Sequence, residues 1–176
     1  MKLIILDHDV VINNYSNIIT KSSVEWTPIQ GSIEAISYLN QMGYRIVVAS
    51  NRSCDKKIID MPRFNSINDR MCKAVNQAGG RIDAIFLSPQ SNTKKYNRSK
   101  LLSIMFEEVT QRFGVDINNV FIVGDNLRYL KAAASSGALP ILVLTGKGGK
   151  IKSTKSLPKN TRIFSDLASV VDTLVK

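Results

Sequence analysis

Short apolar runs alternate along this chain with longer segments in which apolar residues recur every three or four positions. The run at 3–6, Leu-Ile-Ile-Leu, has no polar member, which is typical of a strand buried on both faces of a parallel sheet. Similar runs predict further strands at 45–49, 82–87, 120–123, 141–144 and for a residue or two from 162. The periodic segments between these strands predict helices. One begins after the N-cap Ser32 and ends at Gly43, and the next begins at Pro62 and ends at Gly79. A third passes through Leu102 and ends at Gly114, a fourth spans 127–135, and the last ends at Lys176.

Strands that alternate with helices form βαβ units, in which the strands are parallel and the crossovers are right-handed. The pattern therefore predicts one Rossmann-like, three-layer α/β domain over 1–176 with a mostly parallel sheet. The length of 176 residues and the hydrophobic fraction of 44% suit a single well-buried domain. No apolar stretch approaches the ~20 residues of a membrane span, and we read no secretion signal at the N-terminus, so we expect a cytoplasmic protein without a membrane partner.

The chain is strongly basic, because 24 Lys and Arg residues outnumber 14 Asp and Glu residues and give a net charge of +10. Such an excess indicates anionic partners, which include phosphorylated metabolites, acidic lipids and nucleic acid. The chain has no nucleic-acid-binding motif and no aromatic residues spaced for base stacking, so we expect no nucleic-acid partner. Lysines concentrate at 147–159, a stretch that we expect to be a solvated loop.

Polar side chains follow the predicted strands at the point where each strand ends. They are Asp7 and Asp9 after the first strand, Ser50 and Asn51 after the second, Lys94 and Lys95 beyond the third, and Asp125 after the fourth. The carboxyl ends of parallel strands share one edge of the sheet, where ligands of such folds bind, so we expect these groups to converge. Carboxylates bind hard cations such as Mg²⁺, while hydroxyl, amide and ammonium groups suit phosphoryl oxygens. Together these residues indicate phosphoryl transfer. Asp7 and Asp9 considered without the others would be interpreted more simply as an acidic turn after a strand.

The order of these strand ends resembles the haloacid dehalogenase (HAD) superfamily of phosphatases, in particular its histidinol-phosphatase-like branch and the heptose 1,7-bisphosphate 7-phosphatases. The similarity covers nearly the whole chain and rests on six motifs, which are LDHDVVIN at 6–13, Glu25-Trp26 with Gly31, SNRS at 50–53, Lys94-Lys95, VGD at 123–125 and TGK at 145–147. The resemblance implies a HAD-like fold without a large cap domain and a Mg²⁺-dependent phosphomonoester hydrolase. The implied substrate is a small phosphorylated sugar, D,D-heptose 1,7-bisphosphate, which would lose its 7-phosphate on the way to lipopolysaccharide core heptose.

The resemblance also implies a role for each residue at the strand ends. Asp7 would attack phosphorus and form an aspartyl phosphate, while Asp9 would act as general acid and base. The Mg²⁺ ligands would be Asp7, the main-chain carbonyl of Asp9, and Asp125. The transferring phosphate would be bound by Ser50, Asn51 and Lys95, and the distal part of the substrate by Lys94.

Several positions depart from the family pattern. Val10 and Val11 stand where the family has Gly-Thr, and Tyr129 replaces the second aspartate of its fourth motif. The loop at 88–93 lacks the cysteines and histidine that bind zinc in the family, so we expect no zinc. His8 takes an arginine position, and we expect it to be an exposed turn residue rather than a catalyst.

Two alternatives to this phosphatase stay open. The first is a non-catalytic protein that keeps the HAD fold and binds a phosphosugar or a partner. It stays open because the departures from the family pattern at Val10, Val11 and Tyr129 could reduce or abolish activity. The second is a nucleic-acid 3′-phosphatase, because the chain is basic and related end-processing domains share the first motif. We expect the chain to act as a monomer.

Overall fold

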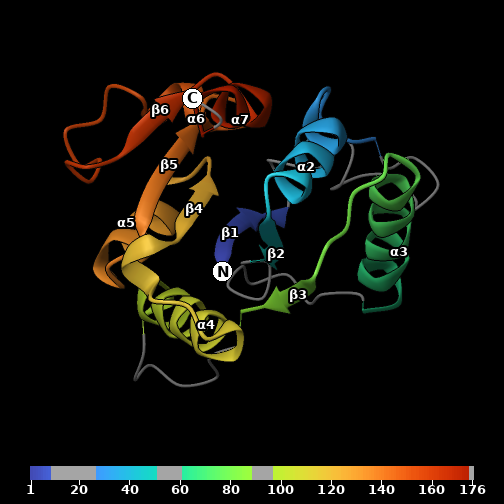
Figure 1. Ribbon diagram of the computed structural model, residues 1–176. Helices are drawn as coiled ribbons and strands as arrows, with labels where there is room; N and C mark the ends of the chain where they lie inside the picture. The colour runs from blue at the N-terminus through green and yellow to red at the C-terminus, as the bar shows by residue number, and fades with distance from the viewer. Residues whose placement is uncertain (9–26, 51–60, 89–96, 175–176) are drawn as a thin grey trace.

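A six-stranded parallel sheet forms the centre of the molecule (Figure 1). The computed structural model describes residues 1–8, 27–50, 61–88 and 97–174. The strands are β1 (Lys2–Asp7), β2 (Tyr44–Ser50), β3 (Ala84–Leu87), β4 (Phe121–Gly124), β5 (Leu139–Val143) and β6 (Arg162–Phe164). Their order is β3-β2-β1-β4-β5-β6, and all neighbours pair in parallel, so the predicted α/β fold is confirmed.

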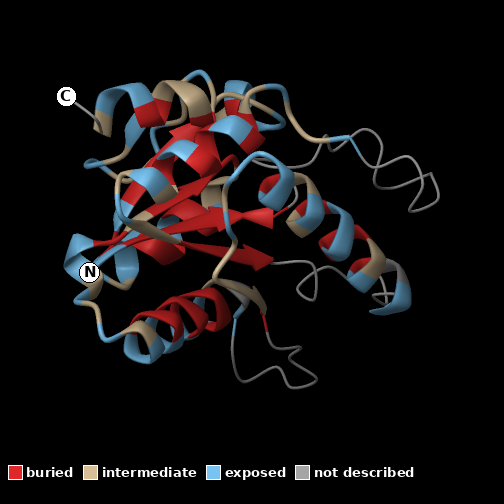
Figure 2. Ribbon diagram, turned by 45° about the vertical axis from the view of Figure 1, so that its right-hand side comes forward, coloured by how far each residue is buried: buried red, intermediate tan, exposed pale blue. Residues whose placement is uncertain are grey.

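Helices cover both faces of the sheet and make three layers (Figures 1 and 2). The helices are α2 (Ser32–Gln41), α3 (Met61–Gln77), α4 (Arg98–Phe113), α5 (Leu127–Ser135), α6 (Gly148–Ile151) and α7 (Leu167–Leu174), with a 3₁₀ turn at Ile117–Asn119. Helices α2, α3 and α7 pack in one core, and α4 and α5 pack in the other. Within the described ranges, no helix is both long enough and apolar enough to cross a bilayer.

The central strand β1 shows why its sequence contains an unbroken apolar run. Ile4 and Leu6 pack in the core beneath α2, α3 and α7, whereas Leu3 and Ile5 pack in the core beneath α4 and α5. All four side chains are at most 1% exposed. Burial of such a side chain contributes on the order of 1.5–3 kcal/mol, so both faces of β1 must be apolar. The strand is consequently fixed at the centre of the sheet.

Three predicted details of the fold are wrong. Gly31, with a φ of 80°, is the N-cap of α2, and Ser32 is instead the buried first residue of that helix. The third strand begins at Ala84 rather than at residue 82. The lysine-containing stretch after residue 147 was expected to be a loop, yet its first residues form the short helix α6.

Candidate active site

The carboxyl ends of β1, β2 and β4 bring three predicted site residues to one edge of the sheet. Asp7 pairs in register with Ala49 of β2, so that Ser50 lies one residue further along the neighbouring strand. On the other side Leu6 pairs with Val123, so Asp125 follows the end of β4. The strand order changes direction between β1 and β4, which is where ligands of open α/β sheets bind. The expected convergence of Asp7, Ser50 and Asp125 at one edge is therefore observed.

These three side chains are buried although each is polar. Asp7 and Asp125 are 1% exposed and Ser50 is fully buried. Two carboxyl groups withdrawn from water at neighbouring strand ends are unfavourable as anions unless hydrogen-bond donors or a cation offset their charge. The surroundings of each carboxylate therefore decide what the site can bind.

Asn126, which directly follows Asp125 beyond the end of β4, supports Asp7. Its amide Nδ2 donates to Oδ2 of Asp7 at 3.2 Å. Its Oδ1 accepts from the backbone N–H of Tyr129 at 2.9 Å and thereby caps α5. One side chain thus joins the start of a helix to the carboxylate at the end of the central strand. The sequence analysis missed Asn126, although an asparagine just before a helix is a recognisable N-cap signal.

Asp125 has one satisfied and one unsatisfied oxygen. Oδ2 accepts from the backbone N–H of Lys147 at 2.6 Å, whereas Oδ1 is buried and has no hydrogen-bond partner in the described part of the chain. Burial raises the pKa of the Asp125 carboxyl above its ordinary value of 3.8, and the Lys147 amide and the Asn126 side chain offset part of that rise. A buried carboxylate oxygen without a donor is a position where a cation fits.

The donor set at this edge suits a magnesium ion better than a transition metal. Asp7 and Asp125 supply two carboxylates, and the described residues contain no group of three or more His, Cys, Asp or Glu side chains arranged for a metal. Mg²⁺ keeps several water ligands and uses one or two protein carboxylates, so this small oxygen set is sufficient for it.

A glycine positions the amide that binds Asp125. Gly148 is the first residue of α6, directly after Lys147, and a Cβ atom there would overlap the backbone oxygen of Val143 in β5. Only glycine allows this close approach of the loop to the strand. The neighbouring Gly149 is less restricted, because a Cβ there would lie 3.7 Å from the Leu144 oxygen.

Tyr129 occupies the core beneath the site. Its side chain is fully buried, its hydroxyl donates to the Ala49 carbonyl oxygen at 3.2 Å, and its ring meets Phe106 edge-on with centroids 5.0 Å apart. A Cβ on Gly124 would come within 2.7 Å of the ring, so the ring lies against the backbone of β4. The residue that replaces the family's second aspartate is therefore a packing residue that links α5 to the end of β2.

His8 differs from its prediction as an exposed turn residue. It is fully buried, its Nε2 lies 2.6 Å from Oδ1 of Asn68 in α3, and its ring centroid lies 5.2 Å from that of Phe64. The sequence could not indicate this, because Asn68 is 60 residues away. His8 ties α3 to the end of β1, immediately after Asp7.

The remaining predicted site residues lie outside the described ranges. These are Asp9, Asn51, Lys94 and Lys95, together with Val10, Val11 and most of the loop at 88–93. Their roles remain predictions.

Comparisons with known proteins identify the class to which the fold belongs. A family model described as HAD-hydrolase-like matches residues 97–170, a range that includes the end of β4 and Asp125. The six-stranded parallel sheet with helices on both faces agrees with this class of hydrolases.

Sequence relatives define the family more narrowly. The chain is 41% identical to a D-glycero-beta-D-manno-heptose-1,7-bisphosphate 7-phosphatase of Bordetella bronchiseptica, over 100% of this chain and 99% of that one. It is 39% identical to the protein of the same name from Neisseria meningitidis, over 95% of this chain and 91% of the relative.

A solved structure agrees with the sequence relatives. The D,D-heptose 1,7-bisphosphate phosphatase of B. bronchiseptica, complexed with magnesium and phosphate, is 40% identical with a TM-score of 0.88, over 99% of this chain and 98% of that one. The chain belongs to the family of heptose-1,7-bisphosphate 7-phosphatases within the HAD-like hydrolases. It is therefore a phosphatase, and the non-catalytic alternative is set aside.

Proposed function

We propose that this phosphatase removes the 7-phosphate of D-glycero-β-D-manno-heptose 1,7-bisphosphate in a Mg²⁺-dependent reaction. The observation that carries the proposal is the pair of buried carboxylates at the β1 and β4 exits, with Oδ1 of Asp125 lacking a donor among the described residues. The names of relatives that match nearly the whole chain support the sugar, and a relative complexed with magnesium and phosphate supports the ion. Nothing described in the structure favours a nucleic-acid substrate.

The proposed chemistry begins at Asp7. One of its carboxylate oxygens attacks phosphorus, the bond between phosphorus and the sugar oxygen breaks, and the leaving oxygen takes a proton from Asp9. Water then attacks the aspartyl phosphate and gives its proton to Asp9, which frees inorganic phosphate and regenerates Asp7. The donor from Asn126 holds one Asp7 oxygen in place, so that the carboxylate keeps a fixed orientation during both steps.

The other residues hold the ion and the phosphate. Asp7, Asp125 and the main-chain carbonyl of Asp9 would bind Mg²⁺, which when bound supplies positive charge to the phosphoryl oxygens. The amide of Lys147 keeps Oδ2 of Asp125 fixed and leaves Oδ1 for the ion. We assign the transferring phosphate to Ser50, Asn51 and Lys95, and the distal part of the substrate to Lys94.

Other parts of the proposal rest on the sequence. The loop at 88–93 offers no thiolate or imidazole, so we predict that the protein holds no structural zinc. A cytoplasmic location and a monomeric state also remain predictions. Elemental analysis of chelator-free protein and sedimentation measurements test the zinc content and the oligomeric state.

A hydrolysis panel tests the substrate and the nucleophile together. Phosphate release is measured with Mg²⁺ on heptose 1,7-bisphosphate, histidinol phosphate, other sugar phosphates and a 3′-phosphorylated DNA oligonucleotide. We expect the highest kcat/KM on the heptose bisphosphate, loss of turnover in Asp7→Asn, and a decrease of about 10²–10⁴-fold in Asp9→Asn. Asp69→Asn, an exposed acid on α3, is the matched control and should keep full activity.

The two parts of the panel fail in different ways. A higher kcat/KM on histidinol phosphate or on the oligonucleotide would refute the heptose assignment while leaving the phosphatase chemistry intact. Undiminished turnover in a folded Asp7→Asn protein would refute the assignment of the nucleophile.

A further inference from the structure

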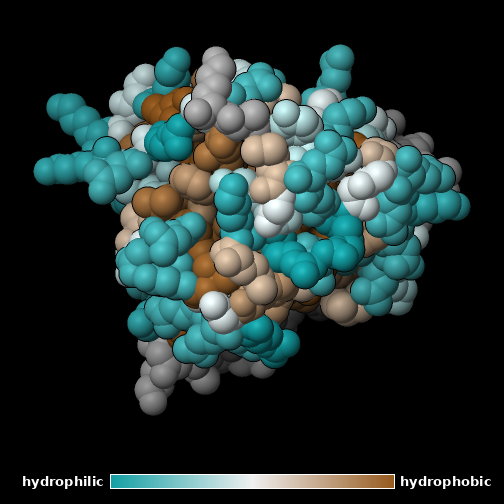
Figure 3. All heavy atoms as spheres, in the orientation of Figure 1, coloured by the Kyte–Doolittle hydropathy of each residue, from teal (hydrophilic) through white to brown (hydrophobic). Residues whose placement is uncertain are grey.

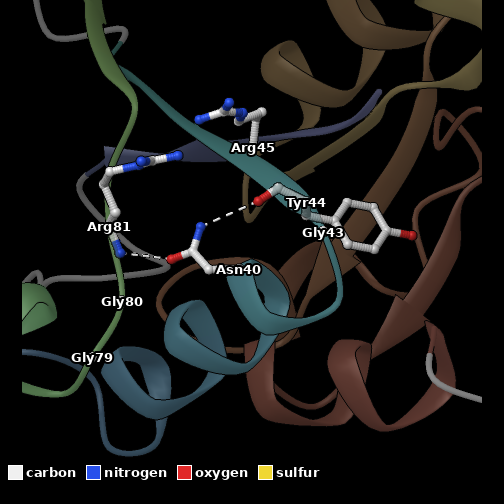
Figure 4. A pocket seen from close by; sticks show the side chains of 7 residues that line it. All are labelled: Asn40, Gly43, Tyr44, Arg45, Gly79, Gly80 and Arg81. Atoms are coloured by element: carbon white, nitrogen blue, oxygen red, sulfur yellow. Dashed lines mark hydrogen bonds between the residues drawn. The ribbon is translucent and has the colours of Figure 1, made fainter.

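A polar cavity lies at the opposite end of the sheet from the carboxylates. It has a volume of about 430 Å³ and is lined by Asn40, Tyr44, Arg45, Arg81 and neighbouring glycine backbone (Figure 4). Tyr44 begins β2, whereas Ser50 ends it, so the cavity is roughly 20 Å from the candidate active site at a rise of about 3.3 Å per residue. Figure 3 shows a strongly hydrophilic patch in this region, over the start of β2 and the segment before β3.

One carboxylate holds two arginines beside this cavity. Oδ1 of Asp83 accepts a hydrogen bond from Arg45 at 2.8 Å and forms an ion pair with Arg81 at 2.9 Å. Oδ2 of Asp83 accepts from the backbone N–H of Ile46 at 2.9 Å, and the Asp83 side chain is only 8% exposed. Both oxygens of Asp83 are thus engaged, and the two guanidinium groups extend toward one another in Figure 4.

The charges of this cluster do not balance. Two cations share one anion, and Lys2 adds a third cation nearby, with its ammonium 5.3 Å from the centroid of the Tyr44 ring. Like charges held close together repel unless another anion joins them. The arginine side chains are 42% and 60% exposed, so their remaining N–H donors are accessible. One carboxylate offsets only one of the two guanidinium charges, so this pair keeps a positive charge that an anionic ligand would neutralise.

Hydrogen bonds of Asn40 hold together the backbone that lines the cavity. Asn40 donates to the Tyr44 carbonyl oxygen at 3.2 Å and accepts from the Arg81 backbone N–H at 2.6 Å, so it ties the start of β2 to the segment before β3. Gly43 borders the cavity with open space around it, because a Cβ there would meet nothing within 4 Å. A preformed site with fixed donors binds at a lower entropic cost than one that must order itself.

We infer that this cavity binds a phosphorylated small molecule between Arg45 and Arg81, separately from the active site. Guanidinium groups bind phosphate oxygens through paired N–H donors. The two positive charges of Arg45 and Arg81 are matched better by a phosphate dianion than by one carboxylate, which carries a single negative charge. The volume falls within the ~300–1,000 Å³ of small-molecule sites and exceeds the size of a lone ion. A compact cavity also fits a metabolite better than an extended nucleic acid, which requires a basic stripe.

Glycine amides make the inference testable by NMR, because glycine signals fall in a distinct region of the spectrum. The ¹⁵N-labelled protein is titrated with glucose 6-phosphate or inorganic phosphate, with EDTA present to prevent turnover and with chloride at equal ionic strength as a reference. We expect saturable shifts at Gly43, Gly79 and Gly80, with tighter binding of glucose 6-phosphate than of inorganic phosphate. Signals of Gly124 and Gly148 report separately on the active site.

Variants assign those shifts to the arginines. Arg81→Gln should weaken binding at least tenfold at the three cavity glycines while leaving the shifts of Gly124 unchanged. Arg112→Gln is the matched control, because Arg112 is an exposed arginine that pairs with Glu108 on α4. Shifts confined to Gly124 and Gly148, equal binding in Arg81→Gln, or no preference for glucose 6-phosphate over inorganic phosphate would each overturn the inference.

Discussion

Asn126 carries two interactions that substitution can separate. Its Oδ1 caps α5, and its Nδ2 donates to Asp7. Serine also caps helices well, but its side chain is too short to span both interactions, so Asn126→Ser removes the contact with Asp7 alone. Asn126→Ala removes both the contact and the cap. Comparing the two variants distinguishes a residue that only stabilises the helix from one that positions the nucleophile.

The expected magnitudes follow from the two contacts. Replacing an N-cap by alanine costs about 1 kcal/mol, which lowers Tm by about 2–4 °C in a protein of this length, and Asn126→Ser avoids this loss because serine keeps the cap. A hydrogen bond to a charged group contributes about 1.5–3 kcal/mol, and the distance of 3.2 Å suggests the lower end. Both variants should therefore lose about tenfold in kcat.

The assay is steady-state hydrolysis of the best substrate of the panel, with thermal unfolding measured on the same preparations. We expect equal decreases of kcat in the two variants, an unchanged KM, and a Tm that is lower in Asn126→Ala than in Asn126→Ser. If Asn126→Ser keeps the kcat of the unaltered protein while Asn126→Ala loses only stability, then Asn126 is a helix cap and the positioning role is refuted.

Substitutions of Asp125, Tyr129 and Gly148 test other contacts of the site. Because burial raises the pKa of Asp125 above 3.8, its charge lowers the stability of the metal-free protein as pH rises above that value, so Asp125→Asn should be at least as stable at pH 7 in EDTA. It should also lose the stabilisation by Mg²⁺, which for the unaltered protein is about 2.7 kcal/mol of unfolding free energy at 100 times Kd and raises Tm. An equal rise of Tm in both proteins contradicts the metal assignment. Tyr129→Asp should lose about 3–5 kcal/mol in urea unfolding because it removes a buried ring, while Tyr129→Phe should lose about 1 kcal/mol; a stable Tyr129→Asp protein would disprove the packing role. Gly148→Ala should weaken the rise of Tm with Mg²⁺ in the same thermal assay, because the new Cβ forces the Lys147 amide away from Asp125. The control Gly149→Ala should keep that rise. Similar responses of the two variants would show that the close approach of Gly148 to Val143 is unimportant.

The sequence was sufficient for those features that depend on local pattern. Unbroken apolar runs predicted strands buried on both faces, and the helical segments between them predicted a parallel sheet. Parallel strands share a carboxyl edge, so Asp7, Ser50 and Asp125 could be assigned to one site before any coordinates.

Features that depend on tertiary contacts were not predictable in this way. His8 is buried because it packs against α3, where its partner Asn68 is 60 residues away in the sequence. The role of Asn126 requires the β4 exit to lie beside the end of β1. Similarly, Gly31 rather than Ser32 caps α2, because the chain enters that helix with a positive φ that only glycine adopts readily.

The position of β1 at the centre of the sheet has a consequence for biosynthesis. The ribosome makes β1 before the other five strands, but its partner β4 pairs Phe121 with Ile4, which is 117 residues earlier. At about 5–20 residues per second, β1 waits roughly 6–23 s for that partner, with apolar groups on both its faces. Asp7 therefore exists long before Asp125, and the nascent chain cannot assemble the carboxylate pair until β4 has been made. We expect chains that terminate before β4 to be inactive and prone to aggregate through the unpaired edge of β1.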